Sequence, residues 1–307
     1  MSDKKILDLY QNCNLCPRNC NVNRKEKRGF CLESDQVSID AALLHFGEEP
    51  PISFKNGSGT IFFTGCSLRC PFCQNMQISQ NPRNKKIYNL EQFIDIIITL
   101  IKKNAENINF VTPDHFLPHI IEAIKYIKKM GYDIPFIYNC SGYQSVYNLE
   151  LSIPYIDIYL FDYKFANKEA SLYCLKNEEY PKIALEGLKF IYKNKGNLTL
   201  KNGKAIKGTL VRHLVMPNFI ENSIEVINNL YFTFGNTIFL SVMSQYTPTF
   251  LKKGFEKINR KITKKEYETV IDLIKNLSFK NVYLQEYIEG DDRYIPDFDR
   301  KNMFDEW

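Results

Sequence analysis

The chain has 307 residues, of which 44% are hydrophobic and 24% are charged, and its formal net charge is +5. These fractions are ordinary for a soluble globular protein. The lysines are spread along the chain rather than gathered in one patch, so the modest positive charge does not indicate nucleic-acid binding.

Targeting and membrane signals are not found in the sequence. No apolar run is long enough to span a bilayer, and residues 1–5 lack the apolar core of a signal peptide. We therefore expect a cytoplasmic protein without membrane contact. In a reducing cytosol, grouped cysteines indicate metal sites rather than disulfides. Of the nine cysteines, Cys140 and Cys174 stand apart from the groups and are expected to be small buried hydrophobes.

Residues 1–55 are expected to form a small cysteine-rich module. Its four thiols are those of Cys13, Cys16, Cys20 and Cys31. Four thiols can complete a site around zinc or around a second iron–sulfur cluster, and the sequence leaves both metals open. A structural role is favoured over electron transfer. The following stretch, 47–51, is expected to be an extended, turn-rich linker.

A buried strand is predicted at 60–64, because this run is β-branched and aromatic. Directly after it come Cys66, Cys70 and Cys73 in the spacing C-x3-C-x2-C. Three thiolates on one loop can hold three irons of a [4Fe–4S] cluster and leave the fourth iron open to a small chelating molecule. A structural zinc loop is the alternative, and the strand before the loop and the βα pattern after it make that alternative weaker.

Strand-like and helix-like stretches alternate over residues 56–250. The other strands are expected at 108–112, 135–138, 156–162, 209–215 and 237–242. The helices are expected at 89–101, 120–131 and 183–192 and from Asn222 onward, with a hairpin at Asn202-Gly203. Residues 251–307 add a helix over 263–277 and a strand over 281–287. We predict an α/β fold with a partial (β/α)6 TIM-like barrel between the N-terminal module and this C-terminal extension.

Polar side chains follow five of the predicted strands. They are found in the stretches 112–115, 139–142, 162–164, 212–213 and 244–246. Because the carboxyl ends of parallel strands meet at one edge of a barrel, we expect these side chains to share one pocket with the three-cysteine loop.

The three-cysteine loop, with the aromatic Phe72 before its last cysteine, resembles the radical S-adenosylmethionine (SAM) superfamily. The barrel is similar to the activating enzymes of glycyl-radical enzymes, typified by pyruvate formate-lyase activating enzyme, and longer runs resemble the PflX-type branch. These runs are CNLCPRNC (13–20), GFC (29–31), GEEPPIS (47–53), GSGTIFF (57–63), CQN (73–75), NINFVTP (107–113) and RHLVMP (212–217). The likeness covers residues from about 10 to 275.

The resemblance implies a radical SAM oxidoreductase in which Cys66, Cys70 and Cys73 hold the [4Fe–4S] cluster. SAM would chelate the open iron, and its reductive cleavage would give a 5′-deoxyadenosyl radical that abstracts a hydrogen atom. A reductant such as flavodoxin or ferredoxin is the implied partner.

The resemblance also implies SAM contacts around the loop. Asp162 and Lys164 match an Asp-x-Lys motif near SAM, and Arg212 matches an arginine that pairs with a SAM carboxylate or ribose. Asn139 stands where the family has an aspartate, and a Gly-Gly-Glu motif is missing after the second strand. Thr112 and Asp114 are expected to contact SAM in place of that motif. Phe72, on the three-cysteine loop, is the remaining expected contact.

A structural role is the alternative for several of these residues. Asp162 and Lys164 form an ordinary ion pair in that alternative, and Arg212 a structural one. Neighbours on a strand face opposite sides, so only one of Arg212 and His213 can face the pocket. The sequence leaves His115 open between a loop residue and a site residue. Gln245 and Tyr246 are weaker candidates, and His45 and His119 are expected to be structural.

Three functions stay open at this point. The first is activation of a glycyl-radical enzyme, with a glycine on a partner protein as the target. The second is modification of a small molecule or of a protein side chain by the same radical chemistry. The third is a non-enzymatic metal-binding adaptor, which does not explain an open three-cysteine site. The extra cysteines precede the loop, whereas activating enzymes with extra clusters carry them after it, and this departure weakens the first function.

Overall fold

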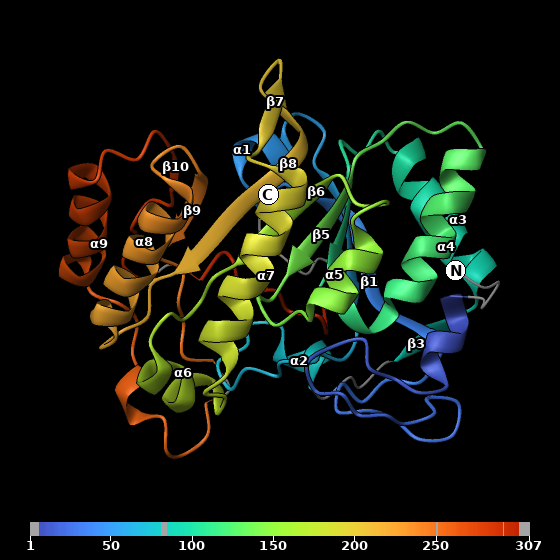
Figure 1. The fold of residues 1–307 in the computed structure, drawn as a ribbon, viewed down its shortest axis with the longest axis horizontal. Helices are drawn as coiled ribbons and strands as arrows, with labels where there is room; N and C mark the ends of the chain where they lie inside the picture. The colour runs from blue at the N-terminus through green and yellow to red at the C-terminus, as the bar shows by residue number, and fades with distance from the viewer. Residues whose placement is uncertain (1–5, 81–84, 250, 291, 301–307) are drawn as a thin grey trace.

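The computed structural model describes residues 6–80, 85–249, 251–290 and 292–300. Its centre is a curved sheet of parallel strands in the spatial order β2-β4-β5-β6-β8-β9-β10, which confirms the predicted barrel-like α/β fold (Figure 1). The strands are β2 (Ser58–Phe63), β4 (Ile108–Val111), β5 (Phe136–Cys140), β6 (Ile158–Asp162), β8 (Lys204–Leu214), β9 (Phe239–Met243) and β10 (Asn281–Leu284).

Antiparallel strands extend the sheet beyond β2. The long strand β1 (Val37–His45) pairs with β2 and with β3 (Lys86–Tyr88). Neither strand was predicted, and β1 lies in the range that the sequence assigned to the cysteine-rich module. The hairpin at Asn202-Gly203 is confirmed, with β7 (Thr199–Lys201) paired to β8.

Helices line the outside of the sheet and pack pairwise, α3 on α4, α4 on α5, α5 on α7 and α8 on α9 (Figure 1). They are α3 (Leu90–Lys102), α4 (Leu117–Lys129), α5 (Val146–Ser152), α6 (Lys168–Leu175), α7 (Tyr180–Lys195), α8 (Ile220–Phe234) and α9 (Lys264–Asn276). Short pieces are α2 (Met76–Ser79), η1 (Ile6–Tyr10), η2 (Asp114–Phe116) and η3 (Glu256–Ile258). No helix in these described ranges combines the length and the apolar character needed to cross a membrane.

Local capping signals explain where two of these helices begin. Asn89 with Gln92 and Thr263 with Glu266 both form the predicted capping boxes. The prediction that Asn222 starts α8 was wrong, because the helix already begins at Ile220. The Asn222 side chain instead accepts hydrogen bonds from the backbone N–H groups of residues 166 and 167. The helices α5 and α6 were not predicted, because they are too short to show a clear apolar stripe.

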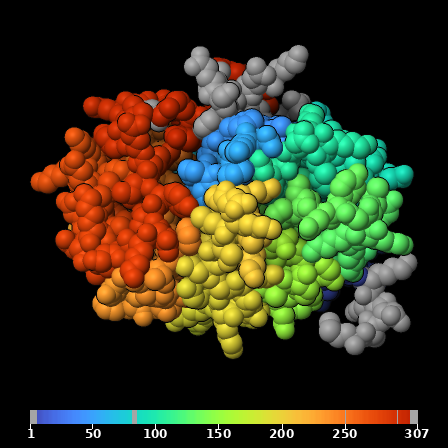
Figure 2. Space-filling view, turned by 90° about the horizontal axis from the view of Figure 1, so that it is seen from above, coloured from blue at the N-terminus to red at the C-terminus, as the bar shows by residue number. Residues whose placement is uncertain are grey.

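The inside of the barrel is closed at its amino end by α1 (Pro50–Ser53), which the sequence had suggested to be part of an extended linker. Two prolines fit the first turn of this short helix, where the missing N–H groups need no partner. Ile52 is fully buried in the inner cluster that contains Ile137, Ile158, Leu160 and Leu210. Figure 2 shows the segment near residue 50, in light blue, filling the space between the other colours on this face. We call residues 48–53 the plug.

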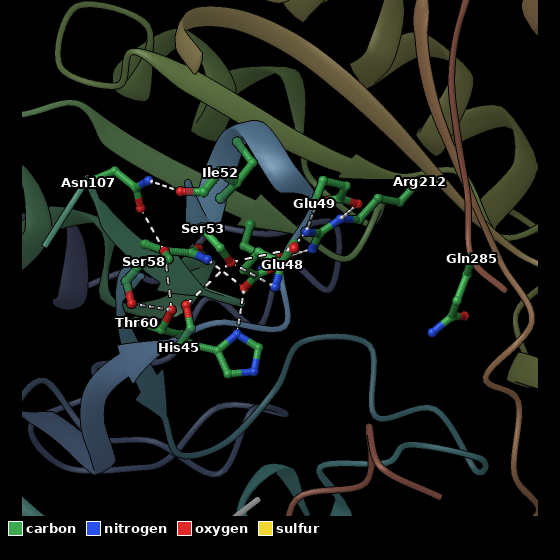
Figure 3. Close-up of polar contacts among 12 residues, drawn as sticks. His45, Glu48, Glu49, Ile52, Ser53, Ser58, Thr60, Asn107, Arg212 and Gln285 are labelled. Atoms are coloured by element: carbon green, nitrogen blue, oxygen red, sulfur yellow. Dashed lines mark hydrogen bonds and ion pairs between the residues drawn. The ribbon is translucent and has the colours of Figure 1, made fainter. Parts of the chain in front are cut away.

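Polar side chains inside the barrel hold the plug in place. Asn107 donates from Nδ2 to the Ile52 carbonyl at 2.7 Å, and its Oδ1 accepts from Ser58 at 2.6 Å (Figure 3). Asn109 donates from Nδ2 to Glu48 at 2.8 Å. The plug therefore meets apolar side chains of β5, β6 and β8 on one side, and Asn107 and Asn109, just before and within β4, on the other.

Candidate active site

One cavity of about 380 Å³ lies at the carboxyl ends of the parallel strands, where the sequence predicts it. It is lined by the three-cysteine loop after β2 and by residues from β4, β5, β6, β8 and β9. The predicted site residues on its wall are Cys66, Cys70, Phe72, Cys73, Thr112, Asn139, Asp162, Lys164 and Arg212. The structure thus brings most of the predicted residues together at one cavity.

The three-cysteine loop presents its sulfur atoms in an environment that suits ligand thiolates. The backbone N–H groups of Leu68 and Arg69 each donate to Cys66 Sγ at 3.4 Å, and Ser79 Oγ donates to Cys73 Sγ at 3.4 Å. Without metal, burial and then the neighbouring Cys73 raise the pKa of the Cys66 thiol to about 12. A metal that replaces these protons relieves the cost of ionising the buried thiols.

The donor set of this loop fits an iron–sulfur cluster. Three thiols lie on one loop, at one cavity, with hydrogen-bond donors aimed at sulfur. Within the described residues, no three Cys, His, Asp or Glu side chains converge closely enough to hold a single metal ion. Three thiols on one loop beside a cavity fit a cluster that leaves one iron open.

Asp162 and Lys164 form an ion pair on the wall beside the loop. Burial alone would lower the pKa of Lys164, but attraction to Asp162, and then to Cys70, raises it above the ordinary value. The ammonium group therefore stays charged next to Cys70. It is positioned to stabilise negative charge on that sulfur.

Other predicted residues shape the wall around the loop. Thr112 has the left-handed φ of 51°, unusual for a β-branched residue, where the chain leaves β4. Phe72 packs its ring against Phe165 and Tyr246, with centroids 6.3 and 6.0 Å apart. Tyr246 also lines the cavity.

Asp114 is not on the cavity wall, so its assignment as a SAM contact is not supported. It is fully buried behind the loop and accepts hydrogen bonds from Ser67 at 3.1 Å, Tyr138 at 2.8 Å and Gln144 at 2.9 Å. Burial raises the pKa of its carboxyl to about 6, against these hydrogen bonds. Its short 3₁₀ helix directs the side chain toward Ser67, which anchors the loop from behind. His115 is likewise buried away from the wall, with Nε2 2.8 Å from the Thr64 carbonyl.

Arg212 lies on the wall, but its guanidinium group is held by the protein itself. Nε donates to Glu49 at 2.8 Å, and Nη2 contacts both Glu48 and Glu49 (Figure 3). Nη1 also reaches Asn139 at 3.4 Å. This geometry supports the structural alternative for Arg212 rather than a pairing with SAM. The prediction that His213 faces the other way is confirmed, since its ring bonds the Tyr163 carbonyl and Ser223 outside the barrel.

Sequence reasoning missed several wall residues. These are His45, Glu48, Glu49, Ser241, Gln285 and Tyr294. The glutamates were assigned to a linker, and His45 was expected to be structural. The sequence does show two adjacent glutamates before a pair of prolines. Their position on the cavity wall follows only from the inward path of the plug. Gln285, drawn apart from the glutamates in Figure 3, comes from the segment after β10.

The N-terminal thiols lie in a module that contacts the three-cysteine loop directly. Arg18 Nε donates to the Ser67 carbonyl at 3.0 Å. A Cβ atom at Gly29 would lie 3.4 Å from Cys20 Sγ and 3.8 Å from Cys31 Sγ, so these two sulfurs flank the glycine. Burial raises the pKa of the Cys16 thiol, as do the nearby thiols of Cys31 and Cys13. The four thiols are thus neighbours, although they do not form a single-ion site in this structure.

Comparisons with known proteins agree with the chemistry of the loop. The model of the radical SAM superfamily matches residues 60–195. The uncharacterized protein MJ0674 of Methanocaldococcus jannaschii is 31% identical over 282 residues, covering 90% of this chain and 78% of that protein. A second protein of that organism, MJ0808, is 26% identical over 120 residues, covering 35% of this chain and 36% of that protein.

Solved structures share the fold at low sequence identity. SuiB of Streptococcus suis has a TM-score of 0.50 and 12% identity, and the match covers 75% of this chain and 48% of SuiB. HydG, a maturase of the [FeFe]-hydrogenase, has a TM-score of 0.51 and 13% identity, with coverage of 73% and 50%. The chain thus matches about half the length of each of these structures.

Proposed function

The chain belongs to the radical SAM superfamily, and from that premise we propose that Cys66, Cys70 and Cys73 hold its [4Fe–4S] cluster beside bound SAM. When bound, the cluster and SAM together supply a 5′-deoxyadenosyl radical that abstracts a hydrogen atom from the substrate. The observation that carries the proposal is the placement of three thiols on the wall of one cavity, where Cys66 and Cys70 are buried and Cys73 is partly buried.

The residues around the thiols would stabilise and orient what is bound there. The N–H groups of Leu68 and Arg69 and the ammonium group of Lys164 offset negative charge on the sulfurs. Asp162 keeps Lys164 in place. Thr112, Asn139 and Phe72 border the remaining space, and we assign them to the walls that position SAM.

The substrate is proposed to be a small molecule or a single side chain rather than a main-chain glycine of a glycyl-radical enzyme. Tyr294 and Pro296, from the described C-terminal segment 292–300, also line the cavity. An activase would have to admit a whole loop of its partner past this segment. A narrow substrate meets no such obstacle, which favours the second function over the first.

The experiment is anaerobic reconstitution with iron and sulfide, followed by an assay for 5′-deoxyadenosine in the presence of SAM and a chemical reductant. The wild type is expected to bind iron and to cleave SAM. Cys70→Ala should lose cleavage, because one of three ligands is gone. Cys174→Ala is the matched control, since Cys174 is buried in α6 and is not among the residues lining the cavity. Cleavage by Cys70→Ala at the wild-type rate would contradict the proposal.

We also propose that Cys13, Cys16, Cys20 and Cys31 hold zinc or a second iron–sulfur cluster. The two sulfurs flanking Gly29 and the mutual effects of the thiols on their pKa values support this. Cys16→Ala should change the iron or zinc content of the purified protein, with the iron of the three-cysteine loop retained. Unchanged metal content together with unchanged folding would exclude a metal in this module.

A further inference from the structure

The lining of the cavity carries more negative than positive charge. We call the part of the lining formed by Glu48, Glu49, Arg212 and Ser241 the floor. Among the described residues that line the cavity, the carboxylates are Glu48, Glu49 and Asp162, and the permanent cations are Lys164 and Arg212. Asp162 is paired with Lys164, so Arg212 alone faces both glutamates. His45 lies 3.5 Å from Glu48.

The two glutamates that share Arg212 are buried in the cavity wall. Their side chains are only 8% and 7% exposed. Burial alone would raise the pKa of Glu48, but attraction to Arg212 and contact with His45 hold it well below its usual range. Glu48 is therefore ionised at neutral pH. Two ionised carboxylates that share one guanidinium leave a net negative charge here, and this charge attracts a cationic ligand.

Glu49 also has unused capacity to accept hydrogen bonds. In the described parts of the chain, its carboxylate accepts only from Nε and Nη2 of Arg212. A carboxylate has about four lone-pair sites. The lone pairs on the cavity side of Glu49 therefore have no hydrogen-bond donor among the described residues, and a ligand can donate to them.

An independent observation points to a ligand at the same place. Ser241 is only 5% exposed, lines the cavity and pairs in register with Arg212 on the neighbouring strand, so both side chains are on the inner face. Its hydroxyl has no hydrogen-bond partner among the described residues. The Ser241 oxygen is open to the cavity, so it is available to a ligand.

Resting on the proposed function, we propose that this floor is the substrate subsite and that it binds a positively charged nitrogen group, a primary ammonium or a guanidinium. Glu49 and Glu48 attract the cation, and the Ser241 oxygen accepts a hydrogen bond from one of the N–H groups of the ligand. Arg212 acts as a positioning residue that holds both glutamates. The charges of the thiolate-ligated cluster and of the SAM sulfonium oppose each other, so these groups leave the imbalance on the floor in place.

The test is calorimetric titration of the anaerobic, cluster-loaded, SAM-bound protein with three probes of one shape: pentylamine, pentanol and pentanoate. The wild type should bind pentylamine about tenfold more tightly than pentanol and bind pentanoate least. Glu49→Gln should reduce the affinity for the amine to that for the alcohol. Ser241→Ala should weaken amine binding severalfold, and it keeps the test valid if Glu49→Gln does not fold. Glu106→Gln is the control, because Glu106 pairs with Lys204 away from the cavity.

The outcomes separate this subsite from the function on which it rests. Equal binding of amine and alcohol by a wild-type protein that cleaves SAM would overturn the subsite alone. A preference for the amine that Glu49→Gln and Ser241→Ala leave unchanged would also overturn it. If Glu49→Gln loses affinity for SAM instead of for pentylamine, the floor serves the ammonium group of SAM and the substrate assignment is wrong. A preserved amine preference in a protein that cannot cleave SAM would reject the proposed function and keep the subsite.

Discussion

Two adjacent residues of β8 have opposite tasks because strand neighbours face opposite sides. Arg212 points into the barrel and holds the plug glutamates, whereas His213 points outward and bonds the Tyr163 carbonyl and Ser223, each at 2.9 Å. The Tyr163 carbonyl can only accept, so His213 Nδ1 carries the proton and Nε2 accepts from Ser223. Protonation of Nε2 would reverse that second hydrogen bond, with Nε2 then donating to Ser223 Oγ, so the loss on protonation comes from burying the charged ring.

This arrangement predicts a loss of stability in acid. Burial lowers the pKa of His213 from 6.5 to about 4. The unfolded chain therefore takes up a proton between pH 6.5 and 4 that the folded protein refuses, and stability falls as the pH falls through this window. The expected contribution is about 3 kcal/mol. Urea unfolding measured from pH 7 to 4 should show a flatter pH dependence for His213→Asn than for the wild type. Identical slopes would show that His213 does not titrate in this way.

At the scale of elements, the plug and the cysteine-rich module both act on the barrel through close packing. Ile52 fills the amino end of the barrel, and the module reaches the loop at Gly65, whose φ is +74°. A Cβ atom at Gly65 would lie 2.4 Å from the Cys31 carbonyl oxygen. Both contacts leave little room for a change of side-chain volume.

Truncation of the plug should destabilise the whole protein. Ile52→Ala removes a fully buried side chain from the inner cluster and is expected to cost about 2 to 5 kcal/mol in free energy of unfolding. Ile87→Ala, at a side chain that is 50% exposed, is the control and should change stability by no more than about 0.5 kcal/mol. Chemical denaturation of both variants measures the difference. A loss of stability no larger for Ile52→Ala than for the control would show that the plug does not support the barrel.

The contact between module and loop is tested by a pair of glycines with similar φ angles. Gly65→Ala introduces both a left-handed alanine and a clash with the Cys31 carbonyl, whereas Gly235→Ala, at φ +77°, meets no atom within 4 Å. We expect Gly65→Ala to cost at least about 2 kcal/mol more than Gly235→Ala. Thermal unfolding gives the comparison. If the two variants lose the same stability, the module does not pack against the loop as described.

Structural elements were predicted correctly where the sequence pattern that specifies them lies within a few residues. The buried run 60–64 and the capping pair Asn89 and Gln92 act within a few residues, and each gave the correct element. The plug could not be predicted, because Ile52 gains its burial from strands more than 80 residues away, and its sequence resembles a linker. Asp114 was misplaced for a similar reason, since only the fold shows that its strand end turns behind the loop. Charge partners such as Glu49 for Arg212 are likewise set by tertiary packing.

At the scale of the whole molecule, segments from both ends of the chain meet the central cavity. The N-terminal module contacts the loop through Arg18, and residues 292–300 reach the wall at Tyr294 and Pro296. Gln77, in α2, donates to Asp297 at 3.1 Å and accepts from the Phe298 N–H at 3.1 Å. The cavity is thus enclosed by parts far apart in sequence.

Release of the C-terminal segment should open the cavity. Gln77→Ala removes both of these hydrogen bonds, so we expect iodoacetamide to alkylate Cys66, Cys70 and Cys73 severalfold faster in metal-free protein. Mass spectrometry follows each thiol, and the rate at buried Cys174 should not change. Gln11→Ala, at an exposed residue bonded to Asp8, is the matched control. Equal rates in Gln77→Ala and wild type would mean that the segment does not limit access.

The central claim is that residues 66–73 hold a cluster with one iron open to SAM. The most direct measurement is electron paramagnetic resonance of the reduced, anaerobically reconstituted protein before and after SAM is added, with Cys16→Ala used to separate any signal of the N-terminal module. We predict a [4Fe–4S] signal that shifts with SAM and is absent in Cys70→Ala. In the Cys16→Ala protein, a cluster signal that is indifferent to SAM, or one that persists unchanged when Cys70→Ala is added, would contradict the account.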